Sequence, residues 1–349
     1  MIKYLGSKRL LVPRIVAAFR AMDAVGTVAD LFSGTSRVGH ALKREGFAVT
    51  ANDHNRYAHA LALCYVQADR ERVGARARRL LRELQALPPA PGYFTETFCE
   101  RSRFFHPRNG ARIDAVREAI AARDLEPELE AVALVSLMEA ADRVDSTTGV
   151  QMAYLKEWAP RAANDLDLRL PDLLPGGGTA LCRDALELAP ELAVDAAYVD
   201  PPYNQHSYLG NYHIWETLVR WDKPEVYGVA CKRTDCREYH SPFNSRPRSA
   251  GAMARLVGGL PAPRLVVSFS DEGHVPRDTL EALLRDKGHV AVVEVDYKRY
   301  VGAQIGIFDP DGRKVGAVSH LRNREFLYVV APTAEEAGRA AEAAEAAAR

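Results

Sequence analysis

The first part of the chain alternates between short apolar runs and a helical spacing of apolar residues. Residues 28–32 form an apolar run that ends in a Gly/Ser turn, and helical sequence follows from about residue 36 to residue 45. A second apolar run covers residues 47–51 and ends at Asn52 and Asp53. Short apolar runs bounded by turn residues are typical of buried strands. The pattern therefore predicts strand, glycine turn, helix and strand, which is half of a Rossmann-like fold.

The middle of the chain is dominated by helical sequence. It extends from about residue 57 to residue 145, with a proline-rich break at residues 87–92. Residues 128–144 are nearly all apolar, which predicts a helix buried against other helices. A Pro/Gly-rich segment at residues 171–178 separates this region from a return to strand-rich sequence.

The last part of the chain predicts further strands, at residues 196–199, 265–269, 290–295, 315–319 and 326–330. Pro276 is suited to the first turn of a helix between the second and third of these. The last two strands, joined across a short polar loop, predict an antiparallel hairpin at the sheet edge. The Ala/Glu-rich sequence after Pro332 is interpreted as a solvated or frayed helical tail.

These elements predict an α/β fold with a helical insertion and a C-terminal antiparallel hairpin. We expect a catalytic domain made of residues 1–68 and 170–332, a helical target-recognition insertion at residues 69–169 and a solvated tail at residues 333–349.

Composition excludes several classes of protein. The 349 residues are 47% hydrophobic and 26% charged, which are ordinary globular values. Five scattered cysteines indicate reduced thiols and predict a cytoplasmic protein. Cys231 and Cys236 are the only close pair, and a structural zinc site needs four ligands, so no metal is predicted. No stretch reaches the roughly 18 apolar residues of a membrane span.

The first candidate site is the loop from Asp30 to Gly39, with the sequence DLFSGTSRVG. Glycine after a buried strand lets the backbone approach a ligand closely, and the helix that follows offers free N–H groups. Asp53 comes 23 residues after Asp30, where an acid accepts hydrogen bonds from ribose hydroxyls in such folds. Taken alone, this motif fits a nicotinamide cofactor as readily as a methyl donor, and a cofactor-free turn nearly as well.

The second candidate site is Asp200-Pro201-Pro202-Tyr203, at the end of a predicted strand. Two prolines stiffen the loop and remove two backbone donors, which leaves carbonyl groups as acceptors. Asp200 and the carbonyl of Pro201 can accept the two hydrogens of an exocyclic amine, and Tyr203 can stack on the base. Accepting both hydrogens localises the nitrogen lone pair, so the nitrogen can attack a sulfonium methyl in line. The competing interpretation is a rigid loop whose carboxylate has a purely structural partner.

Together these motifs resemble the D12 class of adenine-specific DNA methyltransferases, the family of the bacterial DNA adenine methylases. The resemblance covers residues 3–330 and includes the N-terminal YLGSKR, the glycine loop, Asp53, a helical insertion and then DPPY. That order is the α arrangement of the family's motifs. The resemblance implies a Rossmann-like S-adenosylmethionine-dependent methyltransferase fold.

The resemblance also assigns roles to residues. Those that would bind S-adenosylmethionine are Tyr4, Lys8, Asp30, Phe32, Gly34, Asp53 and Asp184. Those that would act on the base are Asp200, Pro201, Pro202 and Tyr203, and Asn204 would help to seat it. The family loop usually reads Phe-x-Gly-x-Gly, and Ser36 stands at the second glycine. Because serine does not readily adopt a positive φ, Phe32 and Gly34 are better candidates than Ser36.

The implied partner is double-stranded DNA. Residues 69–112 hold ten arginines against five acidic residues, and residues 228–264 hold seven basic residues against two acidic ones. Because the whole chain has a formal net charge of zero, these windows concentrate positive charge that can contact phosphate. His206 and His213 are interpreted as surface or packing residues, because amine methylation needs no histidine.

We therefore expect a site-specific DNA adenine N6-methyltransferase that acts on a flipped adenine, either with a cognate restriction endonuclease or as a solitary methylase. One alternative changes the acceptor to cytosine N4 or to an adenine in RNA. An NAD-dependent oxidoreductase is the alternative from another class. A DNA-binding regulator with a degenerate site is disfavoured by the presence of Lys8, Asp53 and Asp200.

Overall fold

A computed structural model describes residues 1–298, 307–308, 314–316 and 322–347. Contacts between residues divide the chain into two compact units. Unit 1 comprises Met1–Val12, Gly26–Leu188 and His206–Ser241, and unit 2 comprises Pro13–Val25, Ala189–Gln205 and Pro242–Arg349. Among the described residues, no helix is both long and apolar enough to cross a membrane.

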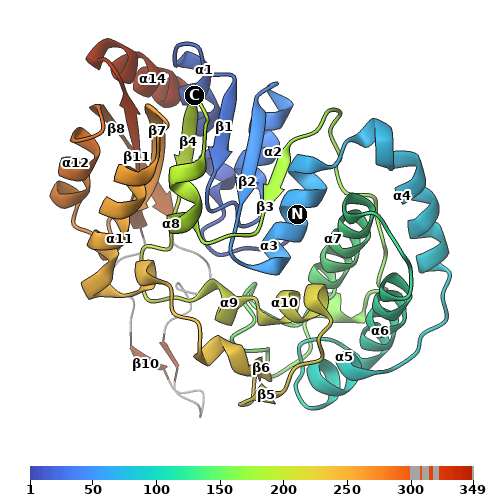
Figure 1. Cartoon of the computed structure of the whole chain (residues 1–349). Helices are drawn as coiled ribbons and strands as arrows, with labels where there is room; N and C mark the ends of the chain where they lie inside the picture. Colours follow the sequence, from blue (N-terminus) through green and yellow to red (C-terminus); the bar gives the residue numbers. More distant parts are fainter. Residues whose placement is uncertain (299–306, 309–313, 317–321, 348–349) are drawn as a thin grey trace. The chain divides into compact units, whose positions relative to one another are not determined.

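Unit 1 contains three parallel strands in the order β3-β2-β1 (Figure 1). The strands are β1 (Thr27–Asp30), β2 (Ala48–Asn52) and β3 (Thr179–Leu181), and α2 (Arg37–Arg44) connects the first two. This strand–loop–helix–strand unit agrees with the predicted Rossmann-like half. Because the strands are parallel, the loops that follow them meet at one edge of the sheet.

The helical part of unit 1 follows β2 in the sequence. Its helices include α3 (Arg56–Ala62), α4 (Arg70–Gln85), α6 (Pro107–Ala121) and α7 (Pro127–Arg143). Helix α7 is buried along nearly its whole length, as its apolar sequence predicts. The aromatic side chains of Phe94, Phe104 and Phe105 lie in the same hydrophobic core, so their role is packing.

The shorter elements of unit 1 are η1 (Lys8–Leu10), α5 (Tyr93–Thr95), α8 (Ala185–Leu188), α9 (Tyr208–Asn211), α10 (His213–Arg220), β5 (Val226–Tyr227) and β6 (Lys232–Arg233). Strands β5 and β6 pair antiparallel in a small sheet of their own. The sequence patterns do not predict this pair or β3, because runs of two or three residues are too short to show a period.

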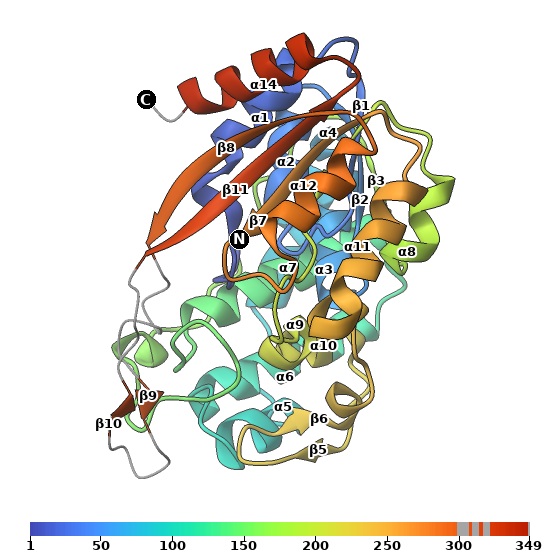
Figure 2. The ribbon, with the colours of Figure 1, turned by 90° about the vertical axis from the view of Figure 1, so that its left-hand side faces the viewer.

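Unit 2 contains four strands in the order β4-β7-β11-β8, visible in Figure 2 where they are labelled. They are β4 (Ala196–Val199), β7 (Arg264–Ser270), β8 (His289–Lys298) and β11 (Arg322–Ala331). Strand β4 runs parallel to β7, and β11 runs antiparallel to both β7 and β8. The helices of this unit are α1 (Val12–Ala21), α11 (Arg246–Gly259), α12 (Arg277–Arg285) and α14 (Ala334–Ala346).

The antiparallel C-terminal arrangement is confirmed, although its strands pair differently from the sequence expectation. Residues 326–330 belong to β11, whose two neighbours are β7 and β8. The expected partner, residues 315–319, overlaps β10 (Lys314–Gly316), which pairs with β9 (Ile307–Phe308) in a separate ribbon. Residues 317–321 lie outside the described residues. A short polar loop between two apolar runs does not identify a hairpin when a third run of similar composition competes for the pairing.

The C-terminal tail forms a helix with one buried face, whereas the sequence predicts a solvated tail. Helix α14 lies against β8 and β11 (Figure 2), and the alanines of one face are buried. Glu336 is buried and pairs with Arg264 through a 2.6 Å contact, and it accepts a 2.8 Å hydrogen bond from the backbone of Asp23. An Ala/Glu composition therefore conceals a packed stripe of small side chains.

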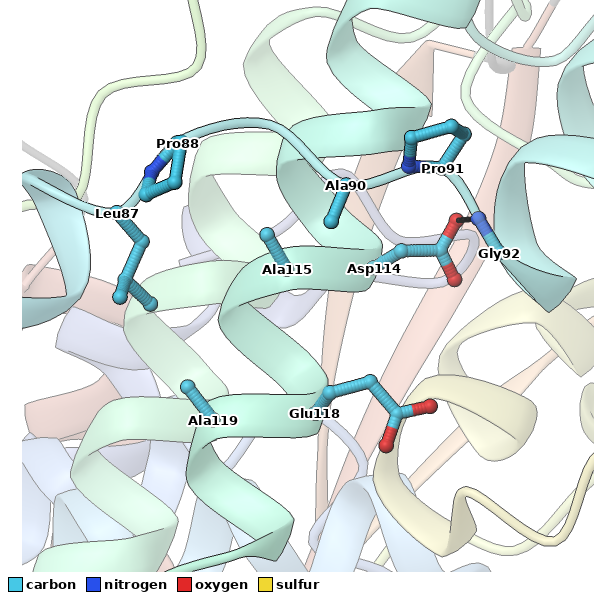
Figure 3. A pocket seen from close by; sticks show the side chains of 9 residues that line it. All are labelled: Leu87, Pro88, Ala90, Pro91, Gly92, Asp114, Ala115, Glu118 and Ala119. Carbon is cyan, nitrogen blue, oxygen red and sulfur yellow. Dashed lines mark hydrogen bonds between the residues drawn. The ribbon is translucent and has the colours of Figure 1, made fainter.

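A cavity of about 380 Å³ lies between the proline-rich loop and α6 of unit 1 (Figure 3). Its wall contains Asp114, whose carboxylate accepts hydrogen bonds from the backbone N–H groups of Gly92, Phe94 and Thr95 at 2.8–2.9 Å. The Thr95 hydroxyl donates a further bond of 2.7 Å. Because all four contacts are internal, Asp114 holds the loop and the start of α5 in place.

We predict that Asp114→Asn lowers the free energy of unfolding by about 2 kcal/mol, because an amide NH₂ would face donors that now point at a carboxylate. Urea unfolding of the purified protein measures this change. Glu118→Gln, on the same cavity wall but exposed and paired with Lys223, is the matched control and should change stability little. A variant Asp114→Asn as stable as the parent would contradict this role.

Candidate active site

Asn52 joins the three loops at the carboxyl edge of the sheet in unit 1. Its side chain is only 1% exposed and donates to the carbonyls of Leu31 and Arg183 at 3.2 and 3.1 Å. Its side-chain oxygen accepts a 3.1 Å hydrogen bond from the backbone N–H of Arg183. One buried amide therefore fixes the loops after β1 and β3 against the end of β2.

Asp53, the next residue, binds the glycine loop directly. One carboxylate oxygen accepts from the backbone N–H of Gly34 at 2.9 Å. The other accepts from the backbone and the side-chain amide of Asn55 at 2.9 and 3.1 Å. Burial raises the pKa of Asp53, and these hydrogen bonds oppose that shift by favouring the charged form. Each carboxylate oxygen can accept more than one hydrogen bond, so Asp53 keeps the capacity to bind ribose hydroxyls.

Tyr4 reaches the same loop from the N-terminal motif. Its ring stacks on Tyr212 with 4.5 Å between centroids and on Tyr208 at 5.3 Å, and its hydroxyl lies 3.1 Å from that of Tyr57. Gly34 has a φ of +49°, and a Cβ atom there would lie 3.2 Å from the Tyr4 ring. Glycine is required at this position because the backbone conformation is left-handed and the aromatic ring is close.

Ser36 occupies the position at which the family has its second glycine. Its φ is +55° and its ψ is 23°, a left-handed conformation that costs serine roughly 1–2 kcal/mol. Its side chain makes no capping hydrogen bond to α2. Instead, Asp30 accepts a 3.0 Å hydrogen bond from the backbone N–H of Gly39, in the first turn of this helix. The serine therefore keeps the glycine-like backbone, which the sequence argument did not expect.

The hydroxyls of Ser33 and Ser36 fit a ligand at this loop. Both are buried and have no hydrogen-bond partner among the described residues. Leaving a buried hydroxyl without a partner costs about 1–3 kcal/mol, which a bound ligand with polar groups can recover. The ammonium and carboxylate of a methionine moiety are such groups.

Asp184 lies in the loop after β3, which Asn52 holds. Its carboxylate accepts a 2.8 Å hydrogen bond from the backbone N–H of Leu186 at the start of α8. Tyr239, which the sequence did not single out, lies close enough to both Asp184 and Asp53 for their charges to act on it. Burial and then Asp184 raise the pKa of Tyr239 to about 12, and its ring stacks on His54 at 4.1 Å between centroids.

The remaining predicted donor-binding residues are Lys8 and Phe32, which also lie in unit 1. Lys8 opens the short helix η1 and is buried, and Phe32 follows β1 and is partly buried. Unit 1 therefore contains all seven residues predicted to bind the donor. The contacts above bring Tyr4, Gly34 and Asp53 together directly.

The predicted catalytic residues lie in unit 2, where β4 ends at Val199 and leads into Asp200, Pro201, Pro202 and Tyr203. The Tyr203 ring packs edge-on against Phe269 with 5.8 Å between centroids. The carbonyl of Tyr203 accepts a 2.7 Å hydrogen bond from the backbone N–H of His274. The carbonyl of Asn204 accepts a 2.6 Å bond from the Asn244 side chain. Contacts with the segments after β7 and before α11 therefore hold this loop.

His213 is a packing residue, as expected from the chemistry. It is fully buried against Phe98 and Phe104, and its ring bonds the carbonyl of Gln151 at 2.9 Å. Burial lowers the pKa of His213 to about 3, so its ring is neutral. No three His, Cys, Asp or Glu side chains gather as a metal site in the described part of the chain.

Much of the charge in the two basic windows is neutralised internally. Arg72 and Arg76 pair with Glu126, which precedes α7, and Arg72 also pairs with Glu128 in its first turn. In the second window, Arg233 is 1% exposed and pairs with Asp222 and Asp235 at 2.7 and 2.9 Å. Arg233 is therefore committed to the fold, whereas Arg72 and Arg76 remain 46% and 49% exposed and their ion pairs only lower the net charge of the first window. The count of charges along the sequence does not reveal this pairing.

A family model described as the D12 class N6 adenine-specific DNA methyltransferases matches residues 4–255. This range includes the N-terminal motif, the glycine loop and the Asp200–Tyr203 loop. Members of the class take their methyl group from S-adenosylmethionine, which agrees with the predicted cofactor.

Individual relatives are modification enzymes. The chain is 26% identical to the modification methylase StsI of Streptococcus sanguinis over 85% of its own length and 48% of that protein. It is 28% identical to the modification methylase LlaI of Lactococcus lactis subsp. lactis over 85% of itself and 51% of that protein. It is 29% identical to the type II methyltransferase M.NlaIII of Neisseria lactamica, over 78% of itself and 83% of that protein. The chain thus spans about half the length of StsI and LlaI.

We predict that Ser36→Gly raises the free energy of unfolding of the donor-free protein by about 1 kcal/mol, because it relieves the left-handed serine and removes a buried hydroxyl. The greater freedom of glycine in the unfolded chain offsets part of the gain. Gly34→Ala is the opposite control and should be destabilising, since its Cβ would press on Tyr4. Urea unfolding of both variants measures the effect, and a less stable Ser36→Gly protein would refute it.

We predict that His213 makes the fold sensitive to acid. Its folded pKa of about 3 lies below the unfolded value of about 6.5, so between these pH values the unfolded state binds the extra proton. Stability from this group is full above pH 6.5 and falls by up to about 1.4 kcal/mol for each pH unit below it. Unfolding at pH 7 and pH 5 should show a smaller loss for His213→Gln than for the parent. His206→Gln, at an exposed histidine, should behave as the parent does.

Proposed function

The chain belongs to the D12 class of N6 adenine-specific DNA methyltransferases, and we propose that it methylates the N6 amine of an adenine within a specific duplex sequence. The observation that carries this proposal is the Asp200-Pro201-Pro202-Tyr203 loop at the end of β4, in a chain whose glycine loop and Asp53 are joined by a hydrogen bond. The two motifs have the residue types that the two halves of the reaction require.

We propose that unit 1 holds the donor. Tyr4 and Lys8 would contact its methionine end, and Asp30 its amino group. Asp53 would accept hydrogen bonds from the ribose hydroxyls. Phe32 and Gly34 would pack around the donor, and Asp184 would contact its adenine. When bound, S-adenosylmethionine supplies an electrophilic methyl group on a sulfonium sulfur.

The loop of unit 2 would act on the target base. Tyr203 would stack on the flipped adenine while the Asp200 carboxylate and the Pro201 carbonyl accept the two hydrogens of its amine, and Pro202 stiffens the loop. These hydrogen bonds direct the nitrogen lone pair toward the methyl carbon. The new C–N bond forms as the C–S bond breaks, and the nitrogen then loses one proton through Asp200 to water. Asn204 would help to seat the base.

Flipping the base costs a few kcal/mol, which contacts with the DNA must offset. We propose that residues 69–169 form the target-recognition insertion and that residues 1–68 and 170–332 form the catalytic part. The methylation reaction would take place in the cytoplasm, where the enzyme has access to the host DNA. The names of the relatives favour a modification enzyme paired with a restriction endonuclease, and a solitary methylase is the other form that the activity can take. Because the family is a methyltransferase class, the NAD-dependent alternative is not retained.

Expression in a host without adenine methylation, followed by nucleoside mass spectrometry and long-read sequencing, tests the reaction. We expect N6-methyladenine confined to one sequence context. N4-methylcytosine would transfer the proposal to the alternative acceptor. If folded protein modifies neither DNA base, methylation of an RNA adenine is tested in the same extracts, and a negative result there rejects the proposed activity.

Two substitutions separate the halves of the site. Asp200→Ala should abolish transfer and leave the affinity for S-adenosylhomocysteine, measured by calorimetry, within about twofold of the parent. Asp53→Ala should weaken that affinity by about tenfold or more, because it removes a charged acceptor for ribose hydroxyls. Retained turnover in Asp200→Ala would remove this residue from its assigned role.

A further inference from the structure

A second cavity in unit 1, of about 520 Å³, is lined by more cationic than acidic side chains. Its walls come from the N-terminal segment, α2, α7 and residues 169–172. Five arginines line it against two carboxylates, Glu139 and Asp172; the arginines are Arg9, Arg37, Arg44, Arg143 and Arg169. None of these residues belongs to the predicted donor or base site.

Three of the arginines are engaged at the rim of this cavity. Arg44 pairs with Asp172 at 2.7 Å, and Arg169 pairs with Asp167 at 2.6 Å. Arg143 donates to the carbonyl of Asp167 at 2.6 Å. Of the two carboxylates, Asp172 is thus taken by Arg44, and Glu139 is taken by the N-terminal ammonium and by the Tyr65 hydroxyl.

Arg9 and Arg37 differ from these three. Neither makes an ion pair or a hydrogen bond through its side chain with a described residue, and the Nε of Arg37 is buried without a partner. Burial and then the charge of Arg9 lower the pKa of Arg37, so the two guanidiniums are close enough to repel, while Tyr65 and Glu139 oppose part of this shift. A buried N–H group without an acceptor and a neighbouring like charge both cost free energy, and an anion held by both guanidiniums offsets both costs.

We infer that this cavity is a phosphate-binding site in which Arg9 and Arg37 hold a backbone phosphate of DNA. The inference rests on the proposed DNA substrate. Guanidinium groups match phosphate oxygens through paired hydrogen bonds, which a lysine ammonium cannot form. The rim arginines Arg44 and Arg169 are 53% and 65% exposed, so a continuous polyanion can cross the opening.

The site adjoins the candidate donor loop. Arg37 is the first residue of α2 and directly follows Ser36, whose backbone is held in the left-handed conformation. A phosphate bound by Arg37 would therefore fix the start of the helix that closes this loop. The two sites share one helix terminus and no side chain.

Binding of a fluorescent duplex to Arg9→Gln and Arg37→Gln, measured over a range of salt concentrations, tests the inference. We expect each variant to bind every duplex sequence about tenfold more weakly and to lower the slope of log K against log salt by about 0.9. Arg285→Gln is the charge-matched control, because Arg285 is exposed on α12 and, among the described residues, pairs with Glu281 alone. Arg9 is exposed, so its substitution tests the site even if Arg37→Gln folds poorly.

A thermal melt in inorganic phosphate at constant ionic strength distinguishes the source of the anion. If phosphate raises the melting temperature of the parent but not of Arg37→Gln, while DNA binding is unaffected by either substitution, the site is real but takes free phosphate. If the two variants match the parent both in duplex affinity and in the effect of phosphate on the melting temperature, the phosphate site is refuted. If the parent protein binds no DNA, the proposed DNA substrate is wrong. The melt in phosphate would then still show whether the cavity binds an anion through Arg37.

Discussion

The candidate donor site depends on one buried side chain, the amide of Asn52. Three parallel strands can end at the same edge of a sheet without their loops holding any fixed relation to one another. In this protein the Asn52 amide bonds the loop after β1 and the loop after β3, and its own backbone carbonyl accepts a 2.9 Å hydrogen bond from Ser33. Asp53 follows it by one residue and ties the glycine loop through Gly34. Asn52 and Asp53 therefore position the residues of these loops that are predicted to bind the donor.

The backbone of the glycine loop is held in a left-handed conformation at two positions. Gly34 and Ser36 both have positive φ, and the Tyr4 ring occupies the space beside Gly34. Strain of this kind persists only where surrounding contacts determine the backbone, and it gathers at ligand sites. Asn52 and Asp53 hold the first half of this loop through Ser33 and Gly34, and Asp30 holds the start of the following helix through Gly39. A serine can therefore replace the family's glycine without changing the path of the chain, at a cost that a ligand contact to its hydroxyl would partly recover.

Local pattern was sufficient for the elements that set up the site, and insufficient for contacts between distant segments. Strand β4 was predicted to the residue, and β1, α2 and β2 to within one or two residues, because turn residues and apolar runs mark them directly. The ring of Tyr4 stacks on that of Tyr212, which lies 208 positions later in the chain. The local sequence around either tyrosine does not predict this contact. The same limit applies to Ser36, where propensity argued against a conformation that three surrounding hydrogen-bonding groups impose. In α14, the buried face consists of small residues, and its burial could not be predicted without knowing that the helix packs against β8 and β11.

Electrostatics shows the difference between counting charges and locating them. The two basic windows of the sequence predict surfaces that bind DNA phosphates. In the structure, however, Arg233, Arg72 and Arg76 in these windows form ion pairs within the protein. The sequence does not single out Arg9 or Arg37 as a phosphate ligand, because Arg9 lies in the N-terminal motif and Arg37 lies within the glycine loop, both of which were assigned to the donor. Neither side chain forms an ion pair with a described residue, because the carboxylates of the same cavity contact other groups directly. In a chain with no net charge, an arginine gains the capacity to bind phosphate when the fold assigns its neighbours' counter-charges elsewhere. Internal pairing is therefore what determines where such a protein can meet a polyanion.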